Sequence, residues 1–173
     1  MRYKIKDIGE GGLDLSVPVN QAWLTSECSE TSIGLGDDGL RFEGRLEPAG
    51  QGYLLRGTLH GTLTAACARC LEPAPIAIDS PMAVNFVEDA PSDDEGDDDL
   101  GDDVLPFEHG VIDLGPPIRD EILLAVPMSP ICREDCAGIC PSCGGNRNLT
   151  PCDCEKQAIE TSKLAALAKI KLQ

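Results

Sequence analysis

Aromatic side chains and histidines are scarce in this 173-residue sequence, in which phenylalanine, tyrosine and tryptophan together make up 3%. A folded core must therefore be built mainly from aliphatic side chains. The two histidines, His60 and His109, form neither an HExxH nor an HxxEH motif. A catalytic zinc site has an open coordination position and usually carries histidine or carboxylate ligands. The sequence therefore argues against a catalytic zinc enzyme.

Long apolar runs are also missing. No stretch approaches the eighteen or so apolar residues of a membrane span, and the first twelve residues, MRYKIKDIGEGG, lack the apolar core of a secretory signal. We therefore expect a cytoplasmic protein that does not associate with membranes. In that compartment thiols stay reduced, and clustered cysteines more often bind a metal than each other.

Basic residues form no obvious patch, whereas acidic residues are abundant and unevenly placed. The formal net charge is −16, and residues 88–103, EDAPSDDEGDDDLGDD, contain ten acids and no base. Such a block repels itself and buries no apolar area, so we expect a solvated, disordered loop. Alternatively, the block attracts a basic partner such as a ribosomal protein. Because phosphate contacts need a basic patch, any contact with RNA must be local.

Cysteines are the most informative residues present. Six of the nine lie in the segment Ile131–Glu155, and the motif Cys140-Pro-Ser-Cys143-Gly-Gly has the form of a zinc knuckle, in which two sulfurs reach one ion and glycines allow a tight turn. The candidate ligands of this segment are Cys132, Cys136, Cys140, Cys143, Cys152 and Cys154. They exceed the four ligands of one tetrahedral ion. We favour structural zinc over an iron–sulfur cluster or a disulfide framework.

A second pair, Cys67-Ala-Arg-Cys70, lies far from this segment in the sequence. It raises the number of clustered cysteines to eight, enough for two four-thiolate sites instead of one. Alternatively it completes a single site, is incidental, or acts as a thiol redox pair or sensor, although it lacks the βαβ setting of thioredoxin-like motifs. Arg69 would favour a thiolate if its guanidinium turns toward a sulfur.

The pattern of apolar residues predicts an α+β fold. From Tyr53 to Thr64, apolar residues and glycines alternate with polar residues, and further alternating runs predict a curved antiparallel sheet or a small open barrel over residues 1–87. Residues 104–173 are expected to form a short strand, a helix over Pro117–Val126, a cysteine-rich zinc-binding turn and a C-terminal helix that packs on the sheet. We expect one compact domain overall, with 88–103 as its acidic loop.

The order of these motifs resembles the YceD family of large ribosomal RNA subunit accumulation proteins. The resemblance rests on the CARCLEP segment at Cys67, the acidic spacer, the segment IDLGPPIRDEILLAVP ending at Pro127, and the cysteine pattern from Cys132 to Cys154. It implies a non-enzymatic factor that supports accumulation of large-subunit ribosomal RNA and has no small-molecule substrate. Some family members lack the C-terminal cysteines but keep a CxRC pair, which implies that the CxRC loop is nearer the shared function.

The expected partner is therefore large-subunit rRNA, a large-subunit ribosomal protein, or both. Candidate phosphate-binding residues near the cysteines are Arg133, Arg147 and Lys156. The expected cofactor is one zinc ion, or two if Cys67 and Cys70 contribute to a second site. The alternative function is a thiol redox protein or sensor that uses Cys67 and Cys70.

Overall fold

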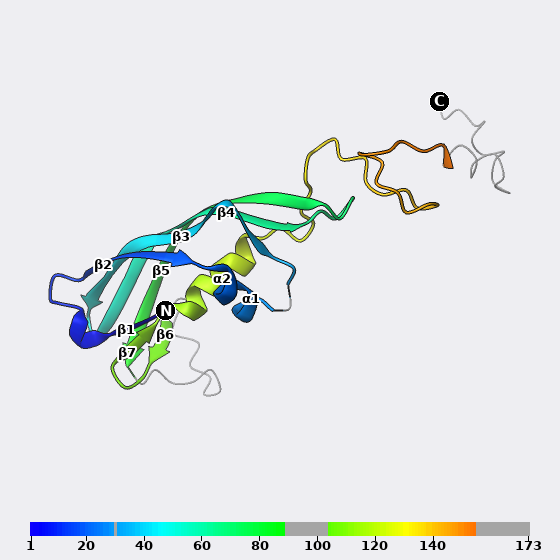
Figure 1. Cartoon of the computed structure of the whole chain (residues 1–173). Helices are drawn as coiled ribbons and strands as arrows, with labels where there is room; N and C mark the ends of the chain where they lie inside the picture. Colours follow the sequence, from blue (N-terminus) through cyan, green and yellow to red (C-terminus); the bar gives the residue numbers. More distant parts are fainter. Residues whose placement is uncertain (30, 89–103, 155–173) are drawn as a thin grey trace, which may run out of the picture. The chain divides into compact units, whose positions relative to one another are not determined.

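The computed structural model describes residues 1–29, 31–88 and 104–154. Within it the chain divides into two compact units (Figure 1). The first contains Met1–Ala65 and Pro75–Met128, and the second contains Ala66–Ala74 together with Ser129–Gln173. The short segment 66–74 therefore belongs to the same unit as the C-terminal cysteines. The sequence-based division into 1–87, 88–103 and 104–173 had placed this segment with the first strands.

A five-stranded open sheet forms the framework of the first unit, with strand order β2-β3-β4-β5-β6. Its strands are β2 (Leu13–Val19), β3 (Gly34–Ala49), β4 (Gly52–Ala66), β5 (Pro73–Glu88) and β6 (Val104–Phe107). β2 pairs antiparallel with β3, and β3 pairs antiparallel with β4. The sheet is open rather than a barrel, because β2 and β6 are its two edges. The α+β class is therefore confirmed.

The last strand adds a parallel pair to the antiparallel sheet that was predicted over residues 1–87. β6 pairs parallel with β5, with Asn85 opposite Val104 and Glu88 opposite Phe107. A parallel pair requires a long crossover connection. The acidic residues between Glu88 and Val104 supply a connection of that length, so the sheet is mixed.

Alternation along β4 places its apolar side chains in the core, as predicted. Leu55, Leu59 and Leu63 are fully buried. Gly57 of β4 is paired with Gly44 of β3, and a Cβ atom on Gly57 would lie 2.5 Å from the ring of Phe42 and 2.4 Å from a backbone oxygen. The absence of side chains on this glycine pair therefore makes room for the buried Phe42 ring.

Two helices, α1 (Gln21–Glu27) and α2 (Gly115–Ala125), contribute to the same core and lie next to each other (Figure 1). Asn20 caps α1, because its side-chain oxygen accepts a hydrogen bond from the backbone N–H of Trp23 at 2.8 Å. α2 begins at a Gly-Pro-Pro sequence, as predicted, and buries Ile118 and Ile122. No helix among the described residues has the length and apolar character needed to cross a membrane.

A small ribbon holds the start of α2. β1 (Arg2–Lys4) pairs antiparallel with β7 (Val111–Asp113), and a 3-10 turn (Ile5–Asp7) follows β1. The Asp113 carboxylate accepts hydrogen bonds from the Arg2 guanidinium and from the Gly115 backbone N–H, both at 2.9 Å. Asp113 therefore links the ribbon to the first turn of the helix.

The second unit has almost no apolar core of its own. Among its described residues, the buried side chains larger than hydrogen are those of Cys67, Cys70, Ala74, Cys136 and Cys140. Its chain consists largely of turns, apart from the strand ends it shares with β4 and β5. The predicted C-terminal helix and most of the acidic loop lie outside the described residues. The packing of that helix on the sheet stays a prediction.

Candidate metal centres

Eight of the nine cysteines form two groups of four, both within the second unit. One group contains Cys67, Cys70, Cys132 and Cys136, and the other contains Cys140, Cys143, Cys152 and Cys154. In each group all sulfur atoms lie within 4.8 Å of one another. The structure thus brings together every metal ligand proposed from the sequence, in two groups that could each hold one metal ion. The ninth, Cys28, is buried in the core of the first unit.

Sulfur separations in the first group match those around a single ion. The Sγ atoms of Cys67 and Cys136 are 3.9 Å apart, and those of Cys70 and Cys132 are 3.6 Å apart. Four sulfurs at about 2.3 Å from a tetrahedral zinc ion would be separated by about 3.8 Å. A disulfide would bring two sulfurs to about 2.05 Å, and all nine cysteines are free. In a four-iron cluster each thiolate binds a different iron, which spreads the ligands apart. The geometry therefore fits one mononuclear ion in each group.

The two CxxC motifs adopt the same turn. The N–H of Leu71 donates to the carbonyl of Cys67 at 2.9 Å, and the N–H of Gly144 donates to the carbonyl of Cys140 at 2.8 Å. The N–H of each first cysteine in turn donates at 2.8 Å to the carbonyl two residues beyond the second cysteine, Glu72 or Gly145. Cys67-Ala-Arg-Cys70 therefore has the same turn geometry as Cys140-Pro-Ser-Cys143.

Backbone N–H groups are directed at the first sulfur of each turn. Burial by itself would raise the pKa of Cys67, but hydrogen bonds from the N–H groups of Arg69, Cys132 and Cys70 outweigh it and lower the pKa to about 6. The N–H groups of Cys143 and Ser142 likewise lower the pKa of Cys140 to about 6, despite its burial. Each turn thus favours the thiolate, the form that binds metal.

Other sulfurs retain their protons when no metal is bound. Burial, together with hydrogen bonds to the Cys70 and Cys136 sulfurs, raises the pKa of Cys132 to about 12. Hydrogen bonds to the Cys143 and Cys152 sulfurs raise the pKa of Cys154 to about 12. Metal binding at either group must therefore displace protons, which makes its affinity depend on pH.

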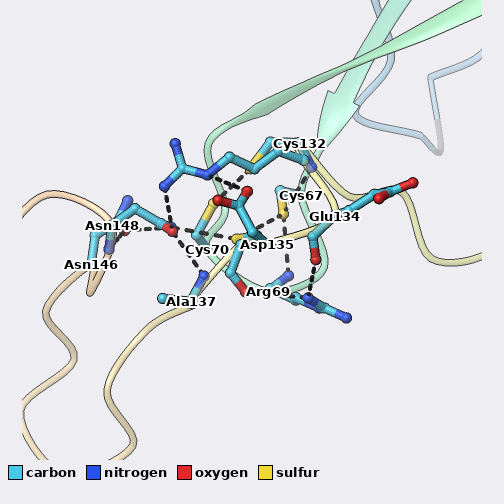
Figure 2. Close-up of polar contacts among 11 residues, drawn as sticks. Cys67, Arg69, Cys70, Cys132, Glu134, Asp135, Ala137, Asn146 and Asn148 are labelled. Carbon is cyan, nitrogen blue, oxygen red and sulfur yellow. Dashed lines mark hydrogen bonds and ion pairs between the residues drawn. The ribbon is translucent and has the colours of Figure 1, made fainter.

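Arg69 acts through its backbone rather than its guanidinium. Its Nη1 donates to the carbonyl oxygens of Glu134 and Cys136 at 3.1 and 3.2 Å, whereas its backbone N–H donates to the Cys67 sulfur at 3.4 Å (Figure 2). The guanidinium thus ties the CxRC turn to the Cys132–Cys136 segment. It does not turn toward a sulfur. The sequence analysis expected Arg69 to favour a thiolate only if its guanidinium made such a contact.

Two asparagines that the sequence analysis did not single out support the first site. Asn148 donates through Nδ2 to the Cys136 sulfur at 3.4 Å, and its Oδ1 accepts from the Ala137 N–H at 2.8 Å (Figure 2). Asn146 accepts from both the backbone and side-chain nitrogens of Asn148. Such contacts orient ligands from outside the coordination sphere. In the sequence, the feature that could have pointed to these two asparagines is their position between Cys143 and Cys152.

The candidate RNA-binding residues have local partners where the structure describes them. Arg133 donates to Asn148 Oδ1 at 2.8 Å and lies 3.2 Å from an Asp135 carboxylate oxygen. The backbone N–H of Arg147 donates to the Gly138 carbonyl at 2.9 Å. Lys156 lies outside the described residues. The assignment of these residues to RNA stays a prediction.

Comparison with known proteins decides the family. Residues 55–171 match the family model described as large ribosomal RNA subunit accumulation protein YceD. The chain belongs to the YceD family. The matched region includes both groups of four cysteines, so the candidate metal centres lie within the part of this YceD chain that the family model covers.

Curated relatives of this YceD chain include bacterial and plant proteins. An uncharacterized protein of Mycobacterium tuberculosis (strain H37Rv) is 36% identical over 100 residues, covering 58% of the chain and 47% of the relative. The chloroplastic large ribosomal RNA subunit accumulation protein YCED homolog 1 of Zea mays is 29% identical over 185 residues, covering 92% of the chain and 58% of the relative. The chain thus spans about half the length of these relatives. No solved structure matches it.

Proposed function

We propose that this protein is a non-enzymatic, cytoplasmic ribosome-biogenesis factor that supports accumulation of large-subunit rRNA. The observation that carries the proposal is the YceD family match over residues 55–171, which spans the two cysteine groups. The plant relative that covers 92% of the chain carries the same accumulation function in its name. The factor acts by binding large-subunit rRNA, a large-subunit ribosomal protein, or both.

Zinc has a structural role in this proposal. The buried side chains of the second unit's described residues are cysteines and one alanine, so apolar burial alone cannot stabilise it. When bound, two zinc ions would supply the missing stability, one through Cys67, Cys70, Cys132 and Cys136 and one through Cys140, Cys143, Cys152 and Cys154. The first would also fix the CxRC turn against the C-terminal segment.

The same geometry argues against a thiol redox function for Cys67 and Cys70. Both side chains are buried, and each sulfur lies beside a sulfur of the Cys132–Cys136 segment. Redox-active cysteines are instead partly exposed and accessible to a second thiol. A four-sulfur group with turn N–H donors favours metal binding.

The function is tested by deleting the gene in its own host and measuring the ratio of large- to small-subunit rRNA. We expect the ratio to fall, and to recover when the intact gene is returned on a plasmid. A plasmid that encodes Cys132→Ala should restore it only in part, because one zinc site is lost. An unchanged ratio in the deletion strain would contradict the proposed function.

Direct RNA contact is tested separately with purified large-subunit rRNA. Replacing Arg147 or Lys156 with glutamine should weaken binding and lower the salt dependence by about one counterion per phosphate contact removed. Arg133 is excluded from this test because it supports Asn148. If both variants bind RNA as the parent does over a range of KCl concentrations, these residues are not phosphate ligands.

A further inference from the structure

A three-residue connector, 137–139, joins the two groups of four cysteines. It follows Cys136, a ligand of the first group, and precedes Cys140, a ligand of the second. The Ile139 N–H in this connector donates at 2.9 Å to the carbonyl of Arg69, which lies in the CxRC turn. The connector is therefore held on one side by the turn of the first group.

On its other side the connector is held by the loop 144–151, which runs between Cys143 and Cys152 of the second group. The Gly138 carbonyl of the connector accepts a hydrogen bond at 2.9 Å from the N–H of Arg147, which lies in this loop. The same connector is thus bonded to structures that belong to different candidate metal sites.

The loop 144–151 has little of its own to hold it in place. None of its residues is buried, so apolar packing contributes little to its order. An ion bound by the second group would close this loop through Cys143 and Cys152. Closing a loop reduces the number of conformations that it can adopt. An ion at the second site should therefore order the loop.

Asn148 carries the contact from this loop to the first site. Its Nδ2 donates to the Cys136 sulfur at 3.4 Å, and its Oδ1 accepts from the Arg133 guanidinium and the Ala137 N–H, both at 2.8 Å (Figure 2). Because two N–H groups bond to the oxygen, the amide nitrogen must be the atom that faces the sulfur. A hydrogen bond to a thiolate is stronger than one to a neutral thiol, so Asn148 favours the metal-binding form of Cys136.

Asn146 fixes the position of Asn148 within the loop. Its Oδ1 accepts from the backbone N–H and from the Nδ2 of Asn148, at 3.0 and 2.9 Å. Its Nδ2 donates to a Glu72 carboxylate oxygen in the CxRC turn at 3.4 Å, and its carbonyl accepts from the Thr150 N–H at 3.0 Å. The ordered loop therefore presents one specific N–H group to a ligand of the first site.

We propose that the two sites bind zinc cooperatively, with Asn148 as the positioning residue through which an ion at the second site strengthens binding at the first. This inference rests on the structural zinc of the proposed function and adds how the two ions depend on each other. When one ion has already ordered the loop, the other binds without the entropy cost of ordering it. The coupling is reciprocal, so each ion strengthens the other by the same factor.

NMR of the full chain resolves the two sites. The Arg69 N–H donates to the Cys67 sulfur at 3.4 Å, so its signal reports an ion at the first site. The Cys143 N–H is directed at the Cys140 sulfur, so its signal reports an ion at the second. Both signals are followed while a competing chelator sets the concentration of free Zn²⁺ under reducing conditions. The two curves give the zinc dissociation constants of the parent.

Two variants supply the affinity of each site alone. Cys152→Ala disables the second site and Cys132→Ala disables the first, and the signal of the disabled site verifies that it stays empty over the titrated range. The product of the parent's two dissociation constants should be smaller than the product of these single-site constants by about tenfold or more. Equal products would show that the sites are independent and would overturn the proposal.

The role of Asn148 is tested by making Asn148→Ala in the parent and in both single-site variants. The difference between the two products should then fall below about twofold, because the loop no longer contacts Cys136. Leu149→Ala is the matched control, since it changes a 74% exposed side chain of the same loop, and it should keep the coupling of the parent.

Asn148→Asp is a second variant that preserves more of the loop. Its carboxylate still accepts from Arg133 and Ala137 but presents an oxygen, instead of an N–H, to the Cys136 thiolate. Ordering the loop would then oppose the first ion, so we expect the coupling to be abolished or reversed. Coupling that persists at the parent's level in both Asn148 variants would overturn the assignment of this residue.

These outcomes separate the inference from the proposal of structural zinc. If neither signal responds to Zn²⁺, the zinc proposal fails and the coupling fails with it. If both sites bind zinc and the products are equal, structural zinc stands and the coupling is wrong. In excess Zn²⁺ each single-site variant should still hold its remaining ion, because the coupling changes affinity and leaves the other four sulfurs in place.

Discussion

A zinc ion bound by Cys67, Cys70, Cys132 and Cys136 would stabilise the first unit, although its ligands belong to the second. This site joins two cysteines that precede most of β5 to two cysteines that follow α2. Residues Pro75–Met128 of the first unit therefore lie inside a loop closed by the metal. Closing a loop lowers the entropy of the unfolded chain and so raises the free energy of unfolding.

The two sites differ in the size of this effect. The loop between Cys70 and Cys132 contains about 60 residues, for which the chain-entropy relation for cross-links gives about 4 kcal/mol. The loop between Cys143 and Cys152 contains about 10 residues, for which it gives about 2.5 kcal/mol, and none of that loop belongs to the first unit. Loss of the first site should therefore destabilise the first unit, and loss of the second should not.

The test compares Cys132→Ala with Cys152→Ala, two cysteines that are both half-buried. Elemental analysis should give two zinc ions per chain for the parent and one for each variant. Urea unfolding is followed by the fluorescence of Trp23, the single tryptophan, which lies in α1 of the first unit. For Cys132→Ala we expect a loss of about 2–4 kcal/mol, which shifts the midpoint by on the order of 1–2 M urea. Cys152→Ala should leave the midpoint unchanged.

Two results would refute this reasoning. If both variants lose one zinc but have the same Trp23 midpoint, the metal does not act by closing the long loop. If the parent contains iron, or no metal, with sulfurs paired in disulfides, the structural-zinc proposal fails. Treatment of the parent with a chelator should reproduce the Cys132→Ala midpoint, which checks that the effect comes from the metal rather than from the side chain.

Two further predictions concern the first unit. Burial would raise the pKa of Asp113, but hydrogen bonds from Arg2 and Gly115 outweigh burial and hold this pKa below its ordinary value of 3.8. The ionised Asp113 carboxylate therefore stabilises the fold above pH 3.8, and this stabilisation is lost as the pH falls through the lower pKa of the folded state. Asp113→Asn should therefore lower the urea midpoint at pH 7, and the difference in midpoint between parent and variant should shrink below about pH 4. A difference in midpoint that does not change with pH would contradict this role of Asp113. Phe42→Ala should lower the free energy of unfolding by about 3–5 kcal/mol, because the ring is fully buried over the glycine pair. As a control in the same urea assay, Glu43→Ala, at an exposed neighbouring position, should change the free energy of unfolding by less than about 0.5 kcal/mol.

The strands and the main helix could be predicted from the sequence because their signals are local. Alternation along β4 placed Leu55, Leu59 and Leu63 on the buried face, and Gly-Pro-Pro marked the start of α2. The parallel pairing of β6 could not be predicted in this way. A short strand has the same alternation in either direction, and its direction depends on where the preceding connection returns the chain.

The sequence by itself determined that this protein has eight clustered cysteines and one recognisable knuckle, because CxxC spacing and glycines are encoded within a few residues. Only the tertiary structure decided how the eight divide. It paired Cys67 and Cys70 with Cys132 and Cys136, which lie more than sixty positions away, leaving Cys140 to group with Cys143, Cys152 and Cys154. Spacing limits which neighbouring sulfurs can share an ion, but long-range contacts depend on how the intervening sheet and helix return the chain. Only the structure shows that Leu71, which follows the second cysteine of the CxRC turn, has a φ of 66°, in the left-handed region that Gly144 occupies in the other turn.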